Sequence, residues 1–367
     1  MLHVTVGHPR TRAMLDLQES AERAGLRFRA LRPAGERERI IFIDKYVTFA
    51  QILNEPSIRS HDIILFTDAY DTLVIGGANE IGRAFLTSGD DIIFNGETTF
   101  WPPATSPDDP LQAYFDNYSD KLCRYLNSGC YIGYAGAIKK MLSECLAWSQ
   151  EDGDHDDQRL ACRFMINAAE RHNLKISVDV ECKIFGTLGG SLNFYHYSGG
   201  SVRNSQTGSW PSVIHANGDK SSIGILSIIN SIQRIYPEGI DLLAVKGQRG
   251  FLHNTLDKNG FVTHEKPSKD ICVAVRVGRD SIILLSADNT SLCSFHPNGH
   301  VSTAKWAKNW EKLNIVEEKI FTCHGNDLNN YTQEINTHLR VCEFPLGAFA
   351  TWTTEHLCRL MVTLSSL

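Results

Sequence analysis

The sequence predicts an α/β fold, followed by a smaller β-rich region. Apolar runs alternate with amphipathic segments from residue 3 to about residue 218, whereas turn-separated β-type runs follow residue 245. The chain has 367 residues, of which 42% are apolar and 21% charged, so it can bury a large core. We expect an α/β domain over 1–222, a helical bridge over 223–244 and a β-rich accessory domain of unknown role over 245–367.

Apolar periodicity places the elements in order. Apolar runs predict strands over 2–6, 27–31, 62–68, 91–97, 130–135, 175–180 and 182–185. Helical spacing predicts helices over 11–26, 45–56, 79–88, 135–150 and 155–172, with Gly25 and Pro56 ending the first two. This alternation favours a mostly parallel sheet. The later β-type runs are 271–277, 281–287, 291–297 and 300–306.

Charge and composition indicate which binding partners and which cellular compartment to expect. The net charge of −6 does not favour nucleic acid as the main partner. No apolar run approaches the ~18 residues of a membrane span, and the start MLHVTVGHPRTR lacks the apolar core of a signal peptide. The ten cysteines form no CxxC pair, which argues against a zinc site. We therefore expect a cytoplasmic protein without a membrane span.

Two carboxylates follow the apolar run that begins at residue 62. Asp68 ends this predicted strand, and Asp71 lies three residues further on. In open α/β sheets ligands bind beyond the carboxyl ends of strands, and paired carboxylates suit a hard divalent cation. Asp68 capping a turn, with Asp71 in solvent, is the alternative. An acid and base pair of a glycosidase is disfavoured, because two residues in one tight turn cannot flank a substrate bond.

Six segments in order resemble one known family. They are LFTDAYDTLVI, FNGETTFWPP, YLNSGCYIGYAGAI, DHDDQ, CKIFGTLGG and VIHANGDK. Together they are similar to the glycosyltransferase domain of the procollagen lysine hydroxylase/glucosyltransferases and related collagen galactosyltransferases, over about residues 3–220. The resemblance implies a GT-A (Rossmann-like) fold. It also implies Mn²⁺-dependent transfer of a hexose from UDP-glucose or UDP-galactose to a hydroxyl-bearing acceptor.

The resemblance assigns residues on the donor side. Asp68, Asp71 and His215 match the metal ligands of the family, and carboxylate plus imidazole is a plausible set for Mn²⁺. By itself, His215 is more typical of a hydrogen-bonded loop histidine than of a metal ligand. The resemblance places four further residues beside Lys45 and Asp68 as donor-binding candidates: Asn127, Asn217, Gly218 and Lys220. LNSG, which contains Asn127, also suits a tight turn before a strand.

The acceptor side is assigned in the same way. Glu97 ends a predicted strand, and Trp101 offers an aromatic platform for a sugar. Asp156 and Asp157 match the acidic catalytic cluster of the family, and Gln158 follows as a substrate-binding candidate. One aspartate would orient the acceptor hydroxyl or take its proton. Trp101 as a loop aromatic, and the acidic run as a solvated surface, are the alternatives.

Departures from the family leave several alternatives open. The family carries a base-stacking aromatic residue where this chain has Thr48, and Tyr46 or Phe49 are the nearby substitutes. A non-catalytic carbohydrate-binding protein and a UDP-sugar hydrolase are the alternative functions. The acceptor classes are a hydroxylysine peptide, a glycan or another hydroxyl-bearing molecule such as a modified nucleobase. The sequence does not choose between retention and inversion, and leaves the oligomeric state open.

Overall fold

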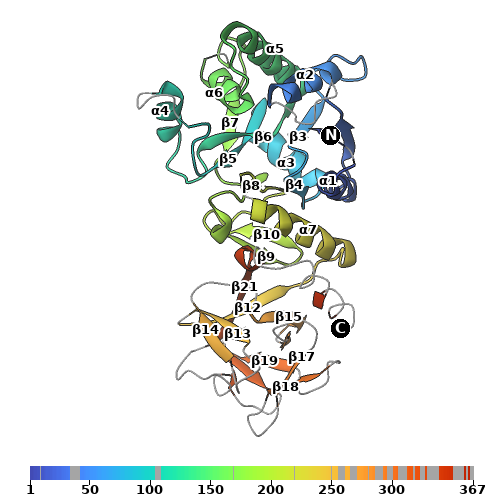
Figure 1. Cartoon of the computed structure of the whole chain (residues 1–367), viewed down its shortest axis with the longest axis vertical. Helices are drawn as coiled ribbons and strands as arrows, with labels where there is room; N and C mark the ends of the chain where they lie inside the picture. The colour runs from blue at the N-terminus through green and yellow to red at the C-terminus, as the bar shows by residue number, and fades with distance from the viewer. Residues whose placement is uncertain are drawn as a thin grey trace. The chain divides into compact units, whose positions relative to one another are not determined.

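The computed structural model forms two compact units (Figure 1). Unit 1 comprises Met1–Leu192 and Asn204–Asn230, and unit 2 comprises Asn193–Arg203 and Ser231–Leu367. The expected boundaries were residues 222 and 244. The observed boundary lies inside one helix, between residues 230 and 231, and residues 193–203 belong to unit 2. The structure describes residues 1–8, 10–33, 42–103, 109–167, 169–218, 220–248, 250–254, 261–264, 271–279, 281–285, 292–295, 301–304, 312–316, 319–322, 327–328, 339–349, 359–360 and 363.

A six-stranded sheet forms the centre of unit 1 in the described part of the chain. Its order is β2-β1-β3-β6-β5-β7, and only β6 runs against the other strands. The carboxyl ends of β3 and β5 therefore share one edge of the sheet with the beginning of β6. The strands are β1 (Leu2–Val6), β2 (Arg27–Leu31), β3 (Ile63–Thr67), β5 (Ile92–Glu97), β6 (Tyr125–Tyr134) and β7 (Ile176–Asp179).

Helices cover both faces of this sheet, which confirms the predicted α/β class and agrees with the GT-A architecture (Figure 1). Alternate strand residues point to opposite faces: Ile64 and Phe66 pack into one core cluster, and Leu65 packs into the other. The first cluster joins α2 (Phe42–Leu53), α4 (Pro110–Asp116), α5 (Ala135–Asp152) and α6 (Asp157–Asn167). The second joins α1 (Arg12–Arg23) and α3 (Ala78–Ser88).

A small second sheet connects distant parts of unit 1. It consists of β4 (Thr72–Val74), β11 (Val213–His215) and β8 (Phe185–Thr187), in the order β4-β11-β8. β11 runs antiparallel to β4 and parallel to β8. The helix α7 (Lys220–Ile235) follows β11 and crosses the boundary between the units. This sheet fixes the end of β11 against the segment that follows β3.

Several sequence predictions need correction. The strand predicted over 130–135 begins earlier, at Tyr125, so LNSG lies inside β6 and does not form the tight turn that was its alternative. The pairing register of β6 with β5 shifts between Phe94 and Asn95. The predicted helix over 155–172 is shorter, since α6 ends at Asn167 and the backbone N–H of Ala169 bonds to the carbonyl of Phe164. The strand predicted over 182–185 begins only at Phe185.

Unit 2 is rich in antiparallel strands, as the sequence predicts. Its largest sheet follows the path β10-β9-β21-β12-β15-β16-β19-β20, with β13 and β14 attached to β12, while β17 pairs with β18. The predicted runs match β15 to β18, and their outer residues 286–287, 291, 296–297, 300 and 305–306 lie outside the described residues. The strands are β9 (Tyr195–Ser198), β10 (Ser201–Asn204), β12 (Leu242–Gly247), β13 (Gly250–Asn254), β14 (Phe261–His264), β15 (Val273–Gly278), β16 (Ser281–Leu284), β17 (Leu292–Phe295), β18 (Val301–Ala304), β19 (Lys312–Val316), β20 (Lys319–Thr322) and β21 (Arg340–Pro345), with the helices η1 (Leu192–Phe194) and α8 (Leu346–Phe349).

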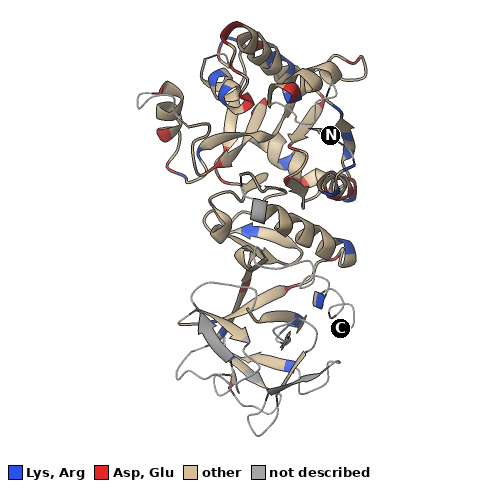
Figure 2. Ribbon diagram, in the orientation of Figure 1, with Lys and Arg blue, Asp and Glu red and all other residues tan. Residues whose placement is uncertain are grey.

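Acidic and basic residues are interspersed along the elements of unit 1 (Figure 2). Within the described ranges, none of the helices has the length and apolar character needed to cross a bilayer.

Candidate active site

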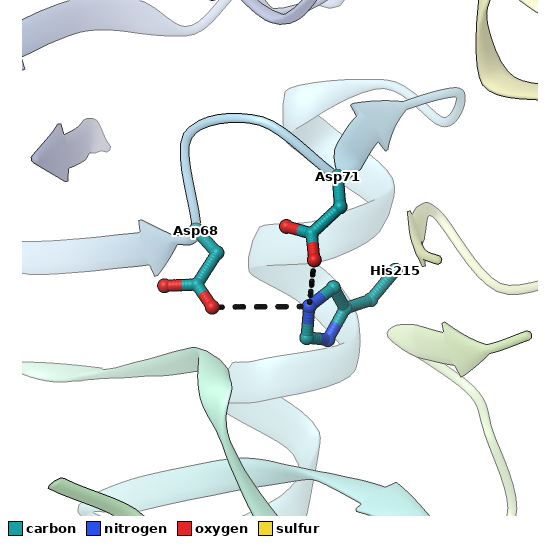
Figure 3. A group of neighbouring side chains, drawn as sticks. All are labelled: Asp68, Asp71 and His215. Carbon is teal, nitrogen blue, oxygen red and sulfur yellow. Dashed lines mark ion pairs between the residues drawn. The ribbon is translucent and has the colours of Figure 1, made fainter. Parts of the chain in front are cut away.

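Three side chains from distant segments meet at the edge of the unit 1 sheet (Figure 3). Asp68 follows β3, and Asp71 precedes β4. His215 ends β11 and lies opposite Thr72 in the antiparallel pair of β4 and β11. The backbone N–H of Ala216 donates to the carbonyl of Asp71 at 2.7 Å, which fixes the two segments together. The pairing of β4 with β11 therefore brings the imidazole to the two carboxylates.

The geometry of these side chains suits a metal ion. Nε2 of His215 lies 3.5 Å from Oδ2 of Asp71 and 3.9 Å from Oδ2 of Asp68. These separations exceed ordinary hydrogen-bond lengths, and the imidazole is only 2% exposed. Gly129 borders the same space: a Cβ there would lie 2.8 Å from Oδ2 of Asp68. Two carboxylates and an imidazole can bind a divalent ion such as Mn²⁺, so the donor set fits.

The protonation of the imidazole and of Asp71 reflects their proximity. Burial lowers the pKa of His215, but the neighbouring Cys130 and the charge of Asp71 outweigh it and leave the pKa well above its ordinary value. Burial raises the pKa of Asp71, but His215 and Lys45 together hold it below its ordinary value. Without a metal, the imidazole therefore keeps a proton between the carboxylates, and a divalent cation would have to displace it.

Lys45, on α2, joins this group to the acidic cluster. Its ammonium lies 2.9 Å from Asp68 and 2.7 Å from Asp157. Burial lowers the pKa of Lys45, but the two carboxylates outweigh this effect and raise it above its ordinary value, so the side chain is charged. The hydroxyl of Tyr46 donates to the backbone carbonyl of Asp157 and fixes α2 against the start of α6. The predicted donor-side lysine thus balances one predicted ligand and one predicted catalytic aspartate.

The adjacent aspartates have different partners. Asp156 precedes α6, and its Oδ1 accepts the backbone N–H of Arg159 at 2.8 Å, as an N-cap does. Asp157 is the first residue of the helix and is buried against Lys45. Asp156 therefore caps the helix at the rim of the site, whereas Asp157 neutralises a buried cation.

Glu97, the last residue of β5, is held by amide groups from two other segments. Gln158 Nε2 donates to its Oε1 at 2.6 Å, and Asn217 Nδ2 donates to its Oε2 at 2.7 Å. Burial raises the pKa of Glu97 to about 7, although these amides oppose the shift. Gln158 also donates to the carbonyl of Trp101 at 2.8 Å and accepts from the N–H of Ser128 at 3.2 Å. Its amide thus positions Glu97 and Trp101, and direct substrate contact stays a prediction.

One cavity of about 580 Å³ in unit 1 gathers the predicted site residues. Among its described lining residues, five are acidic and Lys45 is the only lysine or arginine. Such an excess of negative charge would repel a diphosphate unless a cation is bound, which agrees with the metal-binding donor set. The lining includes Lys45, Asp68, Asp71, Glu97, Trp101, Asn127, Asp156, Asp157, Gln158, His215, Asn217 and Gly218. Lys220 begins α7, but its side chain lies outside the description.

The aromatic residues at the cavity differ from the sequence expectation. Tyr46 and Phe49 are fully buried in the core and cannot stack on a ligand, and Thr48 is buried as well. Phe42 and Trp101 both line the cavity and are 55% and 54% exposed. The sequence analysis missed Phe42, which lies three residues before Lys45, one helical turn away, and so shares its side of α2.

Comparisons with known proteins agree with the motifs. A family model described as "PLOD GT domain" matches residues 34–238. Procollagen-lysine,2-oxoglutarate 5-dioxygenase 1 of Mus musculus is 32% identical over 160 residues, which are 42% of this chain and 21% of the relative. The Drosophila melanogaster procollagen-lysine,2-oxoglutarate 5-dioxygenase is 30% identical over 196 residues, 52% of this chain and 25% of the relative.

A human relative and a solved structure show further similarity. The human multifunctional procollagen lysine hydroxylase and glycosyltransferase LH3 is 30% identical over 164 residues, 44% of this chain and 21% of the relative. The chain thus spans about a fifth to a quarter of the length of these curated relatives. A crystal structure of a glycosyltransferase involved in the glycosylation of the major capsid of PBCV-1 aligns with a TM-score of 0.37 and 9% identity, over 64% of this chain and 98% of that one.

Proposed function

Because this chain belongs to the PLOD GT domain family of glycosyltransferases, we propose that it transfers a hexose from a UDP-sugar to a hydroxyl group with Mn²⁺ as cofactor. The convergence of Asp68, Asp71 and His215 on one point is the observation that carries the proposal. These residues come from segments more than 140 positions apart, and their oxygen and nitrogen donors suit Mn²⁺. UDP-glucose and UDP-galactose are the proposed donors.

On the donor side, the three ligands would hold the ion. A bound divalent cation neutralises the diphosphate charge and the charge that develops on departing UDP. Lys45 adds a fixed positive charge next to Asp68, and its buried position lets it act over a short range in a low-dielectric site. The amide of Asn217 donates to Glu97 and so holds the segment after β11, a donor-side candidate, against the acceptor-side carboxylate.

On the acceptor side, we assign different roles to the carboxylates. Asp156 lines the cavity with its second oxygen free of the helix cap, and it orients the acceptor hydroxyl. Glu97, with its pKa near 7, is matched to proton transfer around neutral pH. Asp157 keeps Lys45 in place. Trp101 offers its half-exposed ring to the acceptor.

The names of the relatives support a choice of the first acceptor to test. Several of them are procollagen-lysine enzymes, so a hydroxylysine-containing peptide is the first acceptor to test. Glycans and other hydroxyl-bearing molecules, a modified nucleobase included, form the second group, because a shared fold does not fix the acceptor.

The test is UDP release from UDP-glucose and UDP-galactose with Mn²⁺, with and without hydroxylysine peptide. We expect acceptor-stimulated release that Asp71→Asn abolishes and Asp120→Asn, a change of an exposed aspartate elsewhere in unit 1, leaves intact. Release that no acceptor stimulates would instead support a hydrolase. Metal-dependent UDP binding without release would support a carbohydrate-binding protein. Neither binding nor release with any donor would refute the proposal.

A further inference from the structure

Asn95 and Thr187 form a buried chain of polar groups behind His215. Nδ2 of Asn95 lies 3.3 Å from Nδ1 of His215, and Oδ1 of Asn95 lies 2.8 Å from Oγ1 of Thr187. The same hydroxyl lies 2.7 Å from the backbone carbonyl of Gly96. Asn95 and Thr187 are completely buried, so their polar groups have to satisfy one another.

The number of available protons determines which group donates in each of these hydrogen bonds. The carbonyl of Gly96 can only accept, and two oxygens 2.7 Å apart need a proton between them, so the Thr187 hydroxyl donates there. The hydroxyl has no second proton, and its contact with Asn95 therefore needs an N–H from the amide. A half-turn of the amide exchanges its oxygen and nitrogen without moving any other atom, and the proton count requires this exchanged orientation. The amide nitrogen then donates to Thr187, and the amide oxygen faces Nδ1 of His215.

The amide oxygen determines which ring nitrogen carries the proton. In the exchanged orientation the amide oxygen takes the position of Nδ2, which lies 3.3 Å from Nδ1 of His215. An oxygen there accepts a hydrogen bond only if Nδ1 is protonated. The neutral imidazole then has its lone pair on Nε2, the nitrogen that faces Asp68 and Asp71. The opposite amide orientation would place the proton on Nε2, where it would block a metal ion. Hydrogen-bonded partners of this kind set the tautomer of histidine ligands.

We propose that Asn95, oriented by Thr187, is a positioning residue that presents Nε2 of His215 as the metal ligand. The inference rests on the proposed function in one respect, the binding of Mn²⁺ by His215. The tautomer of His215 does not depend on that function, because it is a property of the metal-free protein. Neither residue lines the cavity. Asn95 lies in β5 and Thr187 ends β8. Both fall within the resembling segments FNGETTFWPP and CKIFGTLGG, but no role was assigned to either from the sequence.

The tautomer can be read directly in the metal-free protein. Long-range ¹H–¹⁵N correlation spectra of the ¹⁵N-histidine-labelled 367-residue chain, recorded in EDTA at alkaline pH, report which nitrogen of each neutral ring is protonated. His215 is assigned by the signal lost in His215→Gln. We expect a proton on Nδ1. A proton on Nε2 in the wild type would overturn the inference, whatever the protein does with sugars.

Metal binding by matched variants supplies the second readout. Thr187→Val keeps the shape of the side chain but removes the hydroxyl, and Thr187→Ser retains it. We expect Thr187→Val to weaken Mn²⁺ binding in calorimetry about 10–100-fold, with a mixture of tautomers, and Thr187→Ser to bind as the wild type does. Thermal unfolding of both variants checks the fold. If folded Thr187→Val binds Mn²⁺ with the same affinity as the wild type, the inference is overturned. If the wild type does not bind Mn²⁺, the metal site is refuted, and the NMR result alone decides the tautomer.

Discussion

Replacing Glu97 by glutamine should change how the stability of the protein depends on pH. Burial raises the pKa of this carboxyl from 4.5 to about 7 in the folded state. The folded chain thus binds a proton more tightly than the unfolded chain between these values, and its stability falls as the pH rises through them. One pKa unit corresponds to 1.36 kcal/mol, so Glu97 should cost about 3 kcal/mol of unfolding free energy by pH 7. Glu97→Gln removes this loss.

Urea unfolding of the metal-free wild type and Glu97→Gln between pH 4.5 and 7.5 tests this magnitude. The exchange of hydrogen bonds with Gln158 and Asn217 adds a constant offset, which cancels when the slopes of the two curves are compared. We expect the variant to gain about 3 kcal/mol relative to the wild type over this range. Glu151→Gln, at an exposed end of α5, controls for the loss of one carboxylate. A flat difference, or a relative gain by the wild type, would show that the amides keep Glu97 ionised.

Three further outcomes follow from the contacts at the site. Lys45→Met should cost about 3–5 kcal/mol in urea unfolding, because it leaves Asp157 buried without its cation, and adding Asp157→Asn should restore part of the loss. The affinity for Mn²⁺, measured by calorimetry, should rise from pH 6 to pH 8. His215 has a raised pKa and holds a proton that the metal ion must displace. An affinity that does not change with pH would contradict this competition. Trp101→Ala should change the free energy of unfolding by less than about 0.5 kcal/mol but raise the KM of the acceptor, and unchanged acceptor kinetics would remove the ring from the acceptor site.

The positions of two site carboxylates could be predicted from the local sequence, whereas the residues around them could not. Asp68 and Glu97 were found by a local rule, because each ends an apolar strand and strand ends meet at one edge. His215 required the family resemblance, since the pairing of β4 with β11 joins residues that no local pattern connects. Asn127 was assigned to the site but placed before the predicted strand rather than inside it, because a polar, glycine-containing segment looks the same before β6 as within it.

Three site residues could not be predicted from the sequence. Asn95 and Thr187 contact the site only through His215, and the role of Phe42 depends on which side of its helix is exposed. Asn95 gives one signal, a polar side chain that directly follows three apolar strand residues, but its partner Thr187 lies 92 positions later. Phe42 precedes the predicted start of its helix, and the three aromatic or hydroxyl candidates near it are all buried. Which face of α2 meets the cavity depends on how the helix packs on the sheet. Periodicity alone does not place a cavity on either face.

The adjacent aspartates before and in α6 provide a sharp test of the assigned roles. Asparagine caps helices about as well as aspartate, so Asp156→Asn should leave the free energy of unfolding within about 0.5 kcal/mol of the wild type. If its carboxylate orients the acceptor, acceptor-stimulated UDP release should nevertheless fall about 10²-fold, the lower range for loss of a group that assists proton transfer. Asp157→Asn should instead lower stability, because it removes a buried partner of Lys45.

Comparing the two variants separates catalysis from structure within two neighbouring residues. A folded Asp156→Asn with full transfer activity would move the acceptor role to Glu97 or Asp157. Loss of activity in Asp157→Asn without loss of stability would show that Asp157 acts on the substrate rather than on Lys45. The cap bond of Asp156 and the ion pair of Asp157 predict the opposite pattern, since they direct one carboxylate along the helix axis and the other toward α2.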